Sequence, residues 1–218
     1  MPVILGLLAP LQWSLNRVLA VCRWGAVIAL VVMLAAVLYS IPMRYLLRDA
    51  PSWAPQLTLF AMQWMIALMA PVAYRRGGFV AIDMLERALP GRLSTLLTLL
   101  LTLVSLAVLI AALPHATAHV QSGCLFRSAT LWLPFTLELA VPLPGEAALT
   151  LCSGNDWAFG FEWGWTKMPN ALAFVALKIG VILLTAVNAE MVLRLIARLL
   201  GRADRLAPIP DADLPVAE

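Results

Sequence analysis

Charged, histidine and cysteine side chains are scarce in this sequence. Of its 218 residues only 12% are charged, 62% are apolar, and there are two histidines and three cysteines. Several apolar runs reach about twenty residues, the length that a helix needs to cross roughly 30 Å of hydrocarbon. Because a chain of this composition is too apolar for a water-soluble domain, we interpret it as an integral membrane protein.

Residues that perform chemistry are equally few. His115 and His119 have a spacing compatible with one metal ion, but two ligands make an incomplete site and no Cys or Glu cluster accompanies them. Lying on one helix, they also cannot provide both axial ligands of a haem. The sequence has no Gly-rich phosphate loop, serine nucleophile motif or intramembrane pair of carboxylates, and no basic tail for nucleic acid. We therefore predict neither an enzyme nor a cofactor or metal site.

Four apolar segments have the length of transmembrane helices, at residues 24–41, 54–74, 93–113 with an extension to His119, and 170–193. The chain then divides into an interfacial segment (1–20), a region with spans one to three (21–123), an outer loop (124–168), span four (169–200) and a disordered tail (201–218). A signal peptide is the alternative for the first segment, but no convincing cleavage site follows the apolar run.

The sequence YRRGGFVAIDML joins spans two and three. It contains, in order, Arg75, Arg76, Gly77, Gly78 and Asp83. Two cations suit the C-terminal end of a helix, whose dipole favours positive charge, and paired glycines let the chain turn. Residues 79–89 are too short to cross a bilayer, and on a helix their apolar side chains lie opposite the charged ones. We therefore predict an all-α integral membrane protein with four transmembrane helices and a short amphipathic surface helix at 79–89.

Basic residues beside the spans predict the orientation. With four spans, both termini and the loop after span two share one side, which has ten arginines, whereas the other side has four basic residues. The ten are Arg17, Arg23, Arg75, Arg76, Arg87, Arg92, Arg194, Arg198, Arg202 and Arg205, and the four are Arg44, Arg48, Arg127 and Lys167. Because cytoplasmic loops are enriched in basic residues, we predict that both termini are cytoplasmic.

The loop at residues 124–168 contains four tryptophans and reads as an ordered excursion on the outer side. Its apolar stretch at 131–141 is short and contains Pro134, so we predict a re-entrant or interfacial segment and no fifth span. Cys124 and Cys152 either remain free thiols or, in an oxidising compartment, form a disulfide that stabilises the loop by about 3–4 kcal/mol.

Few charges fall inside the spans. Lys178 lies about two turns into the last span, where a charge is costly unless the side chain extends to the interface or meets a partner. Its position near the outer third of the helix favours extension to the interface. Glu190 precedes Arg194 by four residues, which predicts a local ion pair. Together with Gln63, these residues do not form a continuous polar path.

The order of these features resembles the DctQ-type small membrane subunit of tripartite ATP-independent periplasmic (TRAP) transporters. The resemblance rests on MRYLL after the first span, PSWAPQLTLF before the second, YRRGGFVAIDMLERALPGR before the third and TKMPNALAF before the fourth. It covers residues 18–121 and 165–198, and its most specific part is the basic-glycine string that precedes the acid. Residues 126–164 look like an insertion relative to the family.

The resemblance implies a set of residues that contact a partner. They are Trp53, Gln56, Arg75, Arg76, Gly77, Gly78 and Asp83. Trp53 matches the family's tryptophan before the second span, and Asp83 matches the acid of the surface helix. Gln56 differs, because it stands where the family usually has an acid.

The resemblance also implies a function without catalysis, in the bacterial inner membrane. The small subunit packs on the large membrane subunit, which carries the ion-coupled, for instance sodium-coupled, path for organic acids that a periplasmic binding protein delivers. The insertion would then contact the large subunit or the binding protein. Two other functions stay open: a membrane anchor of a redox complex, which would need histidines on different spans, and the small subunit of a tricarboxylate tripartite transporter.

Overall fold

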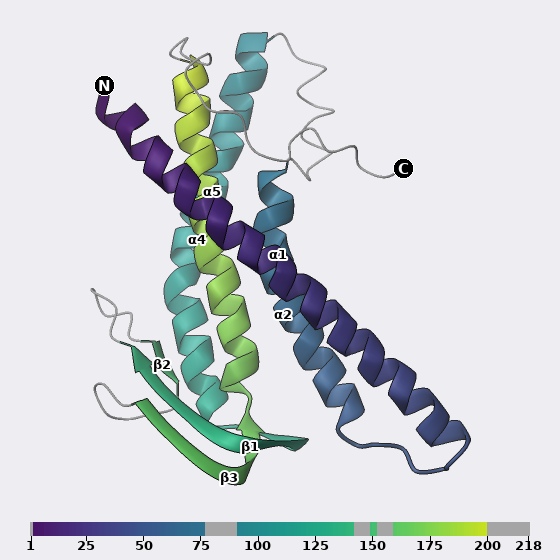
Figure 1. Ribbon diagram of the computed structural model, residues 1–218. Helices are drawn as coiled ribbons and strands as arrows, with labels where there is room; N and C mark the ends of the chain where they lie inside the picture. The colour runs from purple at the N-terminus through teal and green to yellow at the C-terminus, as the bar shows by residue number, and fades with distance from the viewer. Residues whose placement is uncertain (1, 77–90, 142–148, 152–158, 200–218) are drawn as a thin grey trace. The chain divides into compact units, whose positions relative to one another are not determined.

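The computed structural model describes residues 2–76, 91–141, 149–151 and 159–199. In chain order its elements are α1 (Pro2–Tyr45), α2 (Ala54–Arg75), α4 (Gly91–Cys124), β1 (Arg127–Val141), β2 (Leu149–Leu151), β3 (Phe159–Pro169) and α5 (Ala171–Leu199) (Figure 1). The surface helix predicted at 79–89 and the tail predicted at 201–218 lie outside these residues.

The four predicted transmembrane helices are confirmed. The helical stretches long and apolar enough to cross a membrane are Gln12–Tyr45, Ala54–Arg75, Leu93–Gly123 and Ala171–Ala197. Within the described residues no fifth stretch of this kind occurs. α1 runs without a break through both the segment expected at the interface and the first span.

Local backbone chemistry sets the helix ends. After α1, the Asp49 N–H donates to the Met43 carbonyl over 3.2 Å, and Arg48 adopts a positive φ of 54°. The left-handed residue turns the chain out of the helical path directly after α1, as left-handed residues commonly do at helix C-termini. Pro55 is the second residue of α2, where a missing N–H costs nothing because that group would have no helical partner.

Threonine hydroxyls inside the spans are satisfied by their own helices. In α4, Thr98 donates to the Ser94 carbonyl at 3.1 Å and Thr102 to the Thr98 carbonyl at 2.9 Å. In α2, Thr58 donates to the Ala54 carbonyl at 2.9 Å. Because hydrocarbon offers no hydrogen-bond partners, these bonds back to the helix explain how polar residues are tolerated in apolar spans.

The loop between α4 and α5 contains a three-stranded antiparallel sheet in the order β2-β1-β3 (Figure 1). Leu139 pairs with Leu151, Trp132 with Lys167 and Phe135 with Trp163, and the register shifts before Trp132 and after Leu133. Residues 131–141, expected as a re-entrant or interfacial segment, therefore belong to the central strand. The sequence does not predict this sheet, because β1 pairs with a strand, β3, that lies far from it in the sequence.

Contacts between α-carbons divide the chain into two compact units, and each of the four long helices contributes to both. Unit 1 comprises residues 1–24, 68–111 and 182–218, and unit 2 comprises residues 25–67 and 112–181. In unit 1, Leu15, Leu19 and Cys22 form a buried stripe of α1 at helical spacing, and they pack with Val72 and Val187. This cluster joins three helices that are far apart in the sequence.

Unit 2 packs closely through small residues. A side-chain carbon at Gly180 of α5 would lie 3.0 Å from the carbonyl oxygen of Ala67 in α2. Pro71 has no N–H to bond that carbonyl, which leaves it available for a close approach by a neighbouring helix. A side-chain carbon at Gly123 would meet the Phe174 ring at 2.5 Å and the Ala171 backbone at 2.9 Å. Both glycines therefore mark places where two segments nearly touch.

Candidate functional site

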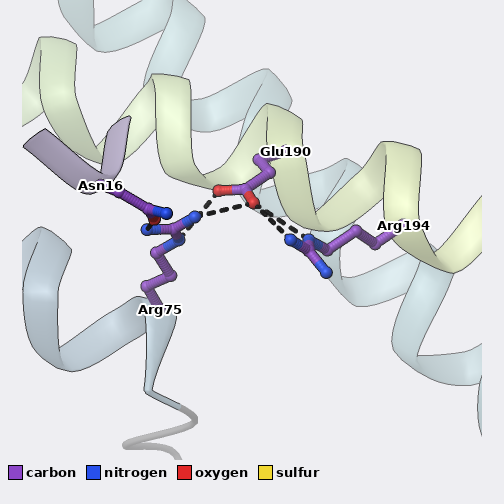
Figure 2. A network of polar contacts seen from close by, with 4 residues as sticks. All are labelled: Asn16, Arg75, Glu190 and Arg194. Atoms are coloured by element: carbon purple, nitrogen blue, oxygen red, sulfur yellow. Dashed lines mark hydrogen bonds and ion pairs between the residues drawn. The ribbon is translucent and has the colours of Figure 1, made fainter. Parts of the chain in front are cut away.

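The main polar site of unit 1 is a charged junction, which we define as Asn16, Arg75, Glu190 and Arg194. Glu190 in α5 is fully buried and binds a guanidinium from each side (Figure 2). Arg75, from the last turn of α2, places Nη2 3.0 Å from Oε1 and Nε 2.9 Å from Oε2 of Glu190. Arg194 places Nε 3.0 Å and Nη2 2.9 Å from Oε1. The Nη1 group of Arg75 donates to Oδ1 of Asn16 in α1.

The junction combines two cations with one anion in a buried place. Arg75 and Arg194 are 6% and 8% exposed, and Glu190 is 0% exposed. Arg75 donates one hydrogen bond to Oε1 of Glu190 through Nη2, and its Nε contacts Oε2 as an ion pair without hydrogen-bond geometry. Such a network holds only when every member is present, because a buried charge without its partner costs several kcal/mol, roughly 3–5. The junction therefore ties α1, α2 and α5 together at one position.

Sequence reasoning identified part of this junction. The predicted pair of Glu190 and Arg194 is present, but Arg75 is the third member and lies 115 residues before Glu190. A usable signal existed, because Glu190 is an acid inside an apolar span while Arg75 ends another span on the same predicted side. Asn16 carried no such signal. A few residues along α5, the buried Asn188 donates to the Ser105 hydroxyl of α4 at 2.8 Å.

Unit 2 contains a neutral counterpart, the contact between Gln56 and Thr130. The Oε1 atom of Gln56 accepts from the Thr130 hydroxyl at 2.6 Å and from its backbone N–H at 3.2 Å. One amide thus joins the start of α2 to β1 and covers a backbone donor of a strand. Nearby, Trp53 stacks on Tyr39 of α1 with ring centroids 5.8 Å apart. Gln56 and Trp53, two of the residues predicted to contact a partner protein, therefore contact other residues of this chain.

A pocket of about 180 Å³ lies between α2, α5 and the sheet of unit 2. Its lining comprises Gln56, Leu59, Phe60, Gln63, Ser128, Leu131, Met168, Asn170, Ala173 and Phe174. All of these side chains are uncharged, and amides and one hydroxyl provide the polar groups. The side chains that line the pocket therefore provide hydrogen-bonding groups but no positive charge for an organic anion.

Lys178 in α5 is buried, with 3% of its surface exposed. We expected its side chain to extend to the interface, and this prediction is wrong. Lys178 follows Ala171 and Val175 on one helical stripe, and these two residues are 0% and 6% exposed, so the stripe faces inward. Glu190, the acidic residue of α5, belongs to unit 1 and is bound to two arginines there. Lys178 belongs to unit 2.

The remaining predicted residues are placed as follows. Arg76 is exposed at the end of α2, whereas Gly77, Gly78 and Asp83 lie outside the described residues. Cys124 ends α4, and Cys152 lies outside the described residues, so their disulfide stays a prediction. The ring of His119 packs on the ring of Phe174, with the two ring centroids 4.1 Å apart. In the described part of the chain, no group of three metal-binding side chains occurs.

Comparison with known proteins gives two findings. A family model described as "Tripartite ATP-independent periplasmic transporters, DctQ component" matches residues 33–158, which is more than half of the chain. The "C4-dicarboxylate TRAP transporter small permease protein DctQ" of Vibrio cholerae serotype O1 is 28% identical over 170 residues. That match covers 75% of this chain and 65% of the relative, so the chain spans just under two thirds of the relative's length.

Proposed function

Because the chain belongs to the DctQ component family of tripartite ATP-independent periplasmic transporters, we propose that it is the small accessory subunit of an ion-gradient-driven transporter. In this role it packs on a large membrane subunit and holds that subunit in the bilayer. The family match carries the proposal, and the relative's name supports organic acids as the transported class. A periplasmic binding protein would deliver the acid to the membrane subunits.

The polar groups of the chain agree with a supporting role. A substrate path needs a cavity with groups that bind the substrate, whereas the pocket of unit 2 is small and has a neutral lining. The charged junction, a buried cluster of charges in the part of the chain that the structure describes, is filled by its own ion pairs. A chain held together in this way suits the stationary part of a transporter, against which another part moves.

We place both termini in the cytoplasm and the sheet in the periplasm. The support is the excess of arginines beside the termini and after the second span. The charged junction then lies at the cytoplasmic end of α2 and α5, and the contact between Gln56 and Thr130 lies at the periplasmic end. An oxidising periplasm would also permit a disulfide between Cys124 and Cys152.

The contact with the large subunit centres, in this proposal, on the turn after α2. Arg75 is buried in the charged junction, and the neighbouring Arg76 is exposed at the surface of the chain. We therefore assign Arg76, Gly77, Gly78 and Asp83 to the partner contact, with Arg75 holding the end of α2 in place. Trp53 and Gln56 remain candidates at the opposite end of that helix.

The test is purification of the tagged chain from its native membranes in a mild detergent, with mass spectrometry of the proteins that co-elute. A large polytopic membrane protein in near-equal amount is the expected result. Arg76→Ala and Asp83→Ala should reduce that amount severalfold while the chain itself stays folded. Arg48→Ala, an exposed arginine at the other end of the spans, is the matched control and should have no effect.

Two results would overturn the proposal. One is purification of the chain without any large membrane protein, under conditions that preserve other membrane complexes. The other is co-elution of haem or soluble redox subunits, which would favour the membrane-anchor alternative. If the large protein co-elutes but the variants at Arg76 and Asp83 retain it fully, the subunit assignment stands and the turn after α2 is not the contact.

A further inference from the structure

One face of the sheet carries two exposed tryptophans and a lysine. Trp132 of β1 pairs with Lys167 of β3, and paired residues of neighbouring strands lie on the same side of a sheet. Trp165 precedes Lys167 by two residues and therefore lies on that side too. The ammonium of Lys167 sits over the Trp132 ring, 5.7 Å from its centroid. We define Trp132, Trp165 and Lys167 as the aromatic–cation face.

The opposite face of the sheet packs against helices. Met168 is 5% exposed and Ser128 is 3% exposed, and both line the pocket together with residues of α2 and α5. Met168 follows Lys167 directly, so their side chains point to opposite sides of β3. The aromatic–cation face therefore turns away from the pocket and from the helices that line it.

Exposed tryptophans on a face turned away from the helices of this chain indicate a binding surface. Trp132 and Trp165 are 50% and 73% exposed. Tryptophan is enriched among the residues that dominate protein interfaces, because it buries a large area and has few rotatable bonds. The pairing of β1 with β3 fixes the backbone beneath both rings, so docking would order little that is not already ordered. Lys167 adds a positive charge, which favours a partner surface with carboxylates around an apolar spot.

We propose that the aromatic–cation face docks a water-soluble protein whose surface offers carboxylates around an apolar patch. This inference rests on the proposed function, which supplies such a protein in the form of the periplasmic binding protein. The face fits an extended protein surface better than a small molecule, because the exposed groups are spread over two paired strands. The sheet would add affinity to a complex whose main contacts lie on the large subunit.

Lysine footprinting tests this directly, because the chain has only two lysines and the other, Lys178, is buried. The complex of both membrane subunits in nanodiscs is treated with a membrane-impermeant amine reagent, and modification at residue 167 is measured by mass spectrometry. We expect Lys167 to be modified in the complex alone and protected at least fivefold when the soluble binding protein is added. Equal modification in both samples would overturn the proposal. Protection in both samples would show that lipid or the large subunit covers the face, and would also overturn it.

Variants provide the second measurement. Trp132→Ala combined with Trp165→Ala should weaken binding of the soluble protein to the nanodisc complex at least tenfold. The matched control combines Trp13→Ala with Trp24→Ala, which removes two tryptophans of α1 that are 66% and 71% exposed. Lys167→Glu keeps both rings and should weaken binding most at low salt, whereas Lys167→Arg should not.

The two proposals fail separately. Retention of the large subunit by the tagged chain reports on the proposed function and does not involve the sheet. If that retention is normal and the double tryptophan variant binds the soluble protein as well as the wild type does, only the docking face is wrong. If the control variant, Trp13→Ala with Trp24→Ala, loses as much binding of the soluble protein as the double variant of the sheet does, the docking face is wrong as well.

Discussion

The two units hold their helices together by different chemistry. Unit 1 uses the charged junction, in which Glu190 binds Arg75 and Arg194 in a buried place. Unit 2 uses uncharged contacts: the amide of Gln56 on Thr130, and the close approach of Gly180 to Ala67. Its one buried charge, Lys178, takes no part in a comparable network in the described residues. Among the described residues, buried charge is therefore paired with opposite charge in unit 1 and not in unit 2.

The largest expected effect is at the centre of the charged junction. Glu190→Gln removes the buried carboxylate that both guanidinium groups bind, which we expect to destabilise the chain by about 3–5 kcal/mol. Unfolding in mixed detergent micelles measures this. Arg44→Gln is the control, because this exposed arginine in the last turn of α1 should matter by only about 0.5 kcal/mol. Equal stability of the two variants would show that the junction is not a structural tie.

The opposite sign is expected at the buried charge of unit 2. Lys178→Met removes an intramembrane ammonium whose cost at a helix centre is about 2.5–3.5 kcal/mol on insertion scales. We expect the isolated chain to gain on the order of 2 kcal/mol in the same unfolding assay. Lys178→Arg keeps the charge and should bring no gain. A loss of stability in the methionine variant would mean that the ammonium has a favourable partner, and the contrast between the units would disappear.

Close packing in unit 2 gives an effect of intermediate size. Gly123→Ala places a carbon 2.9 Å from backbone atoms of Ala171, an overpacking that we expect to cost about 1–2 kcal/mol. Gly180→Ala meets the Ala67 carbonyl at 3.0 Å, but alanine gains up to about 1 kcal/mol of helix propensity, so its net effect should be near zero. Thermal unfolding of both variants checks this order. The reverse order would show that the contact of α2 with α5 is the tighter one.

The smallest effect concerns the neutral contact between Gln56 and Thr130. A double-mutant cycle of Gln56→Leu and Thr130→Val should give a coupling energy of about 1 kcal/mol, because the two hydrogen bonds are uncharged and partly exposed. The same cycle on Arg75→Met and Glu190→Gln is the matched comparison and should give a larger value. Similar coupling energies in both cycles would remove the distinction between a charged and a neutral joint.

Much of the helical architecture could be predicted because its signal is local. The second span is predicted at residues 54–74 and is found at Ala54–Arg75, and the fourth is predicted at 170–193 and is found at Ala171–Leu199. A run of apolar residues about 30 Å long specifies a span without reference to any partner. The ion pair of Glu190 with Arg194 is local in the same sense, because four residues make one helical turn.

The sheet and the inward direction of Lys178 could not be predicted in this way. β1 and β3 pair across an intervening loop, so Trp132 and Lys167 become neighbours only when the chain folds back. The direction of Lys178 depends on which stripe of α5 its neighbours cover, and periodicity in a uniformly apolar helix does not identify that stripe. The turn and surface helix at residues 77–89 stay a prediction.

The sequence by itself determined the membrane class, the number of spans and their approximate ends, because hydrophobic length acts along one segment at a time. Only the tertiary structure decided that Arg75 meets Glu190 across 115 residues, that Gln56 covers a strand, and that two tryptophans share an exposed face. These contacts join segments that are distant in the sequence, and their energies exist only once the helices and strands have packed against one another.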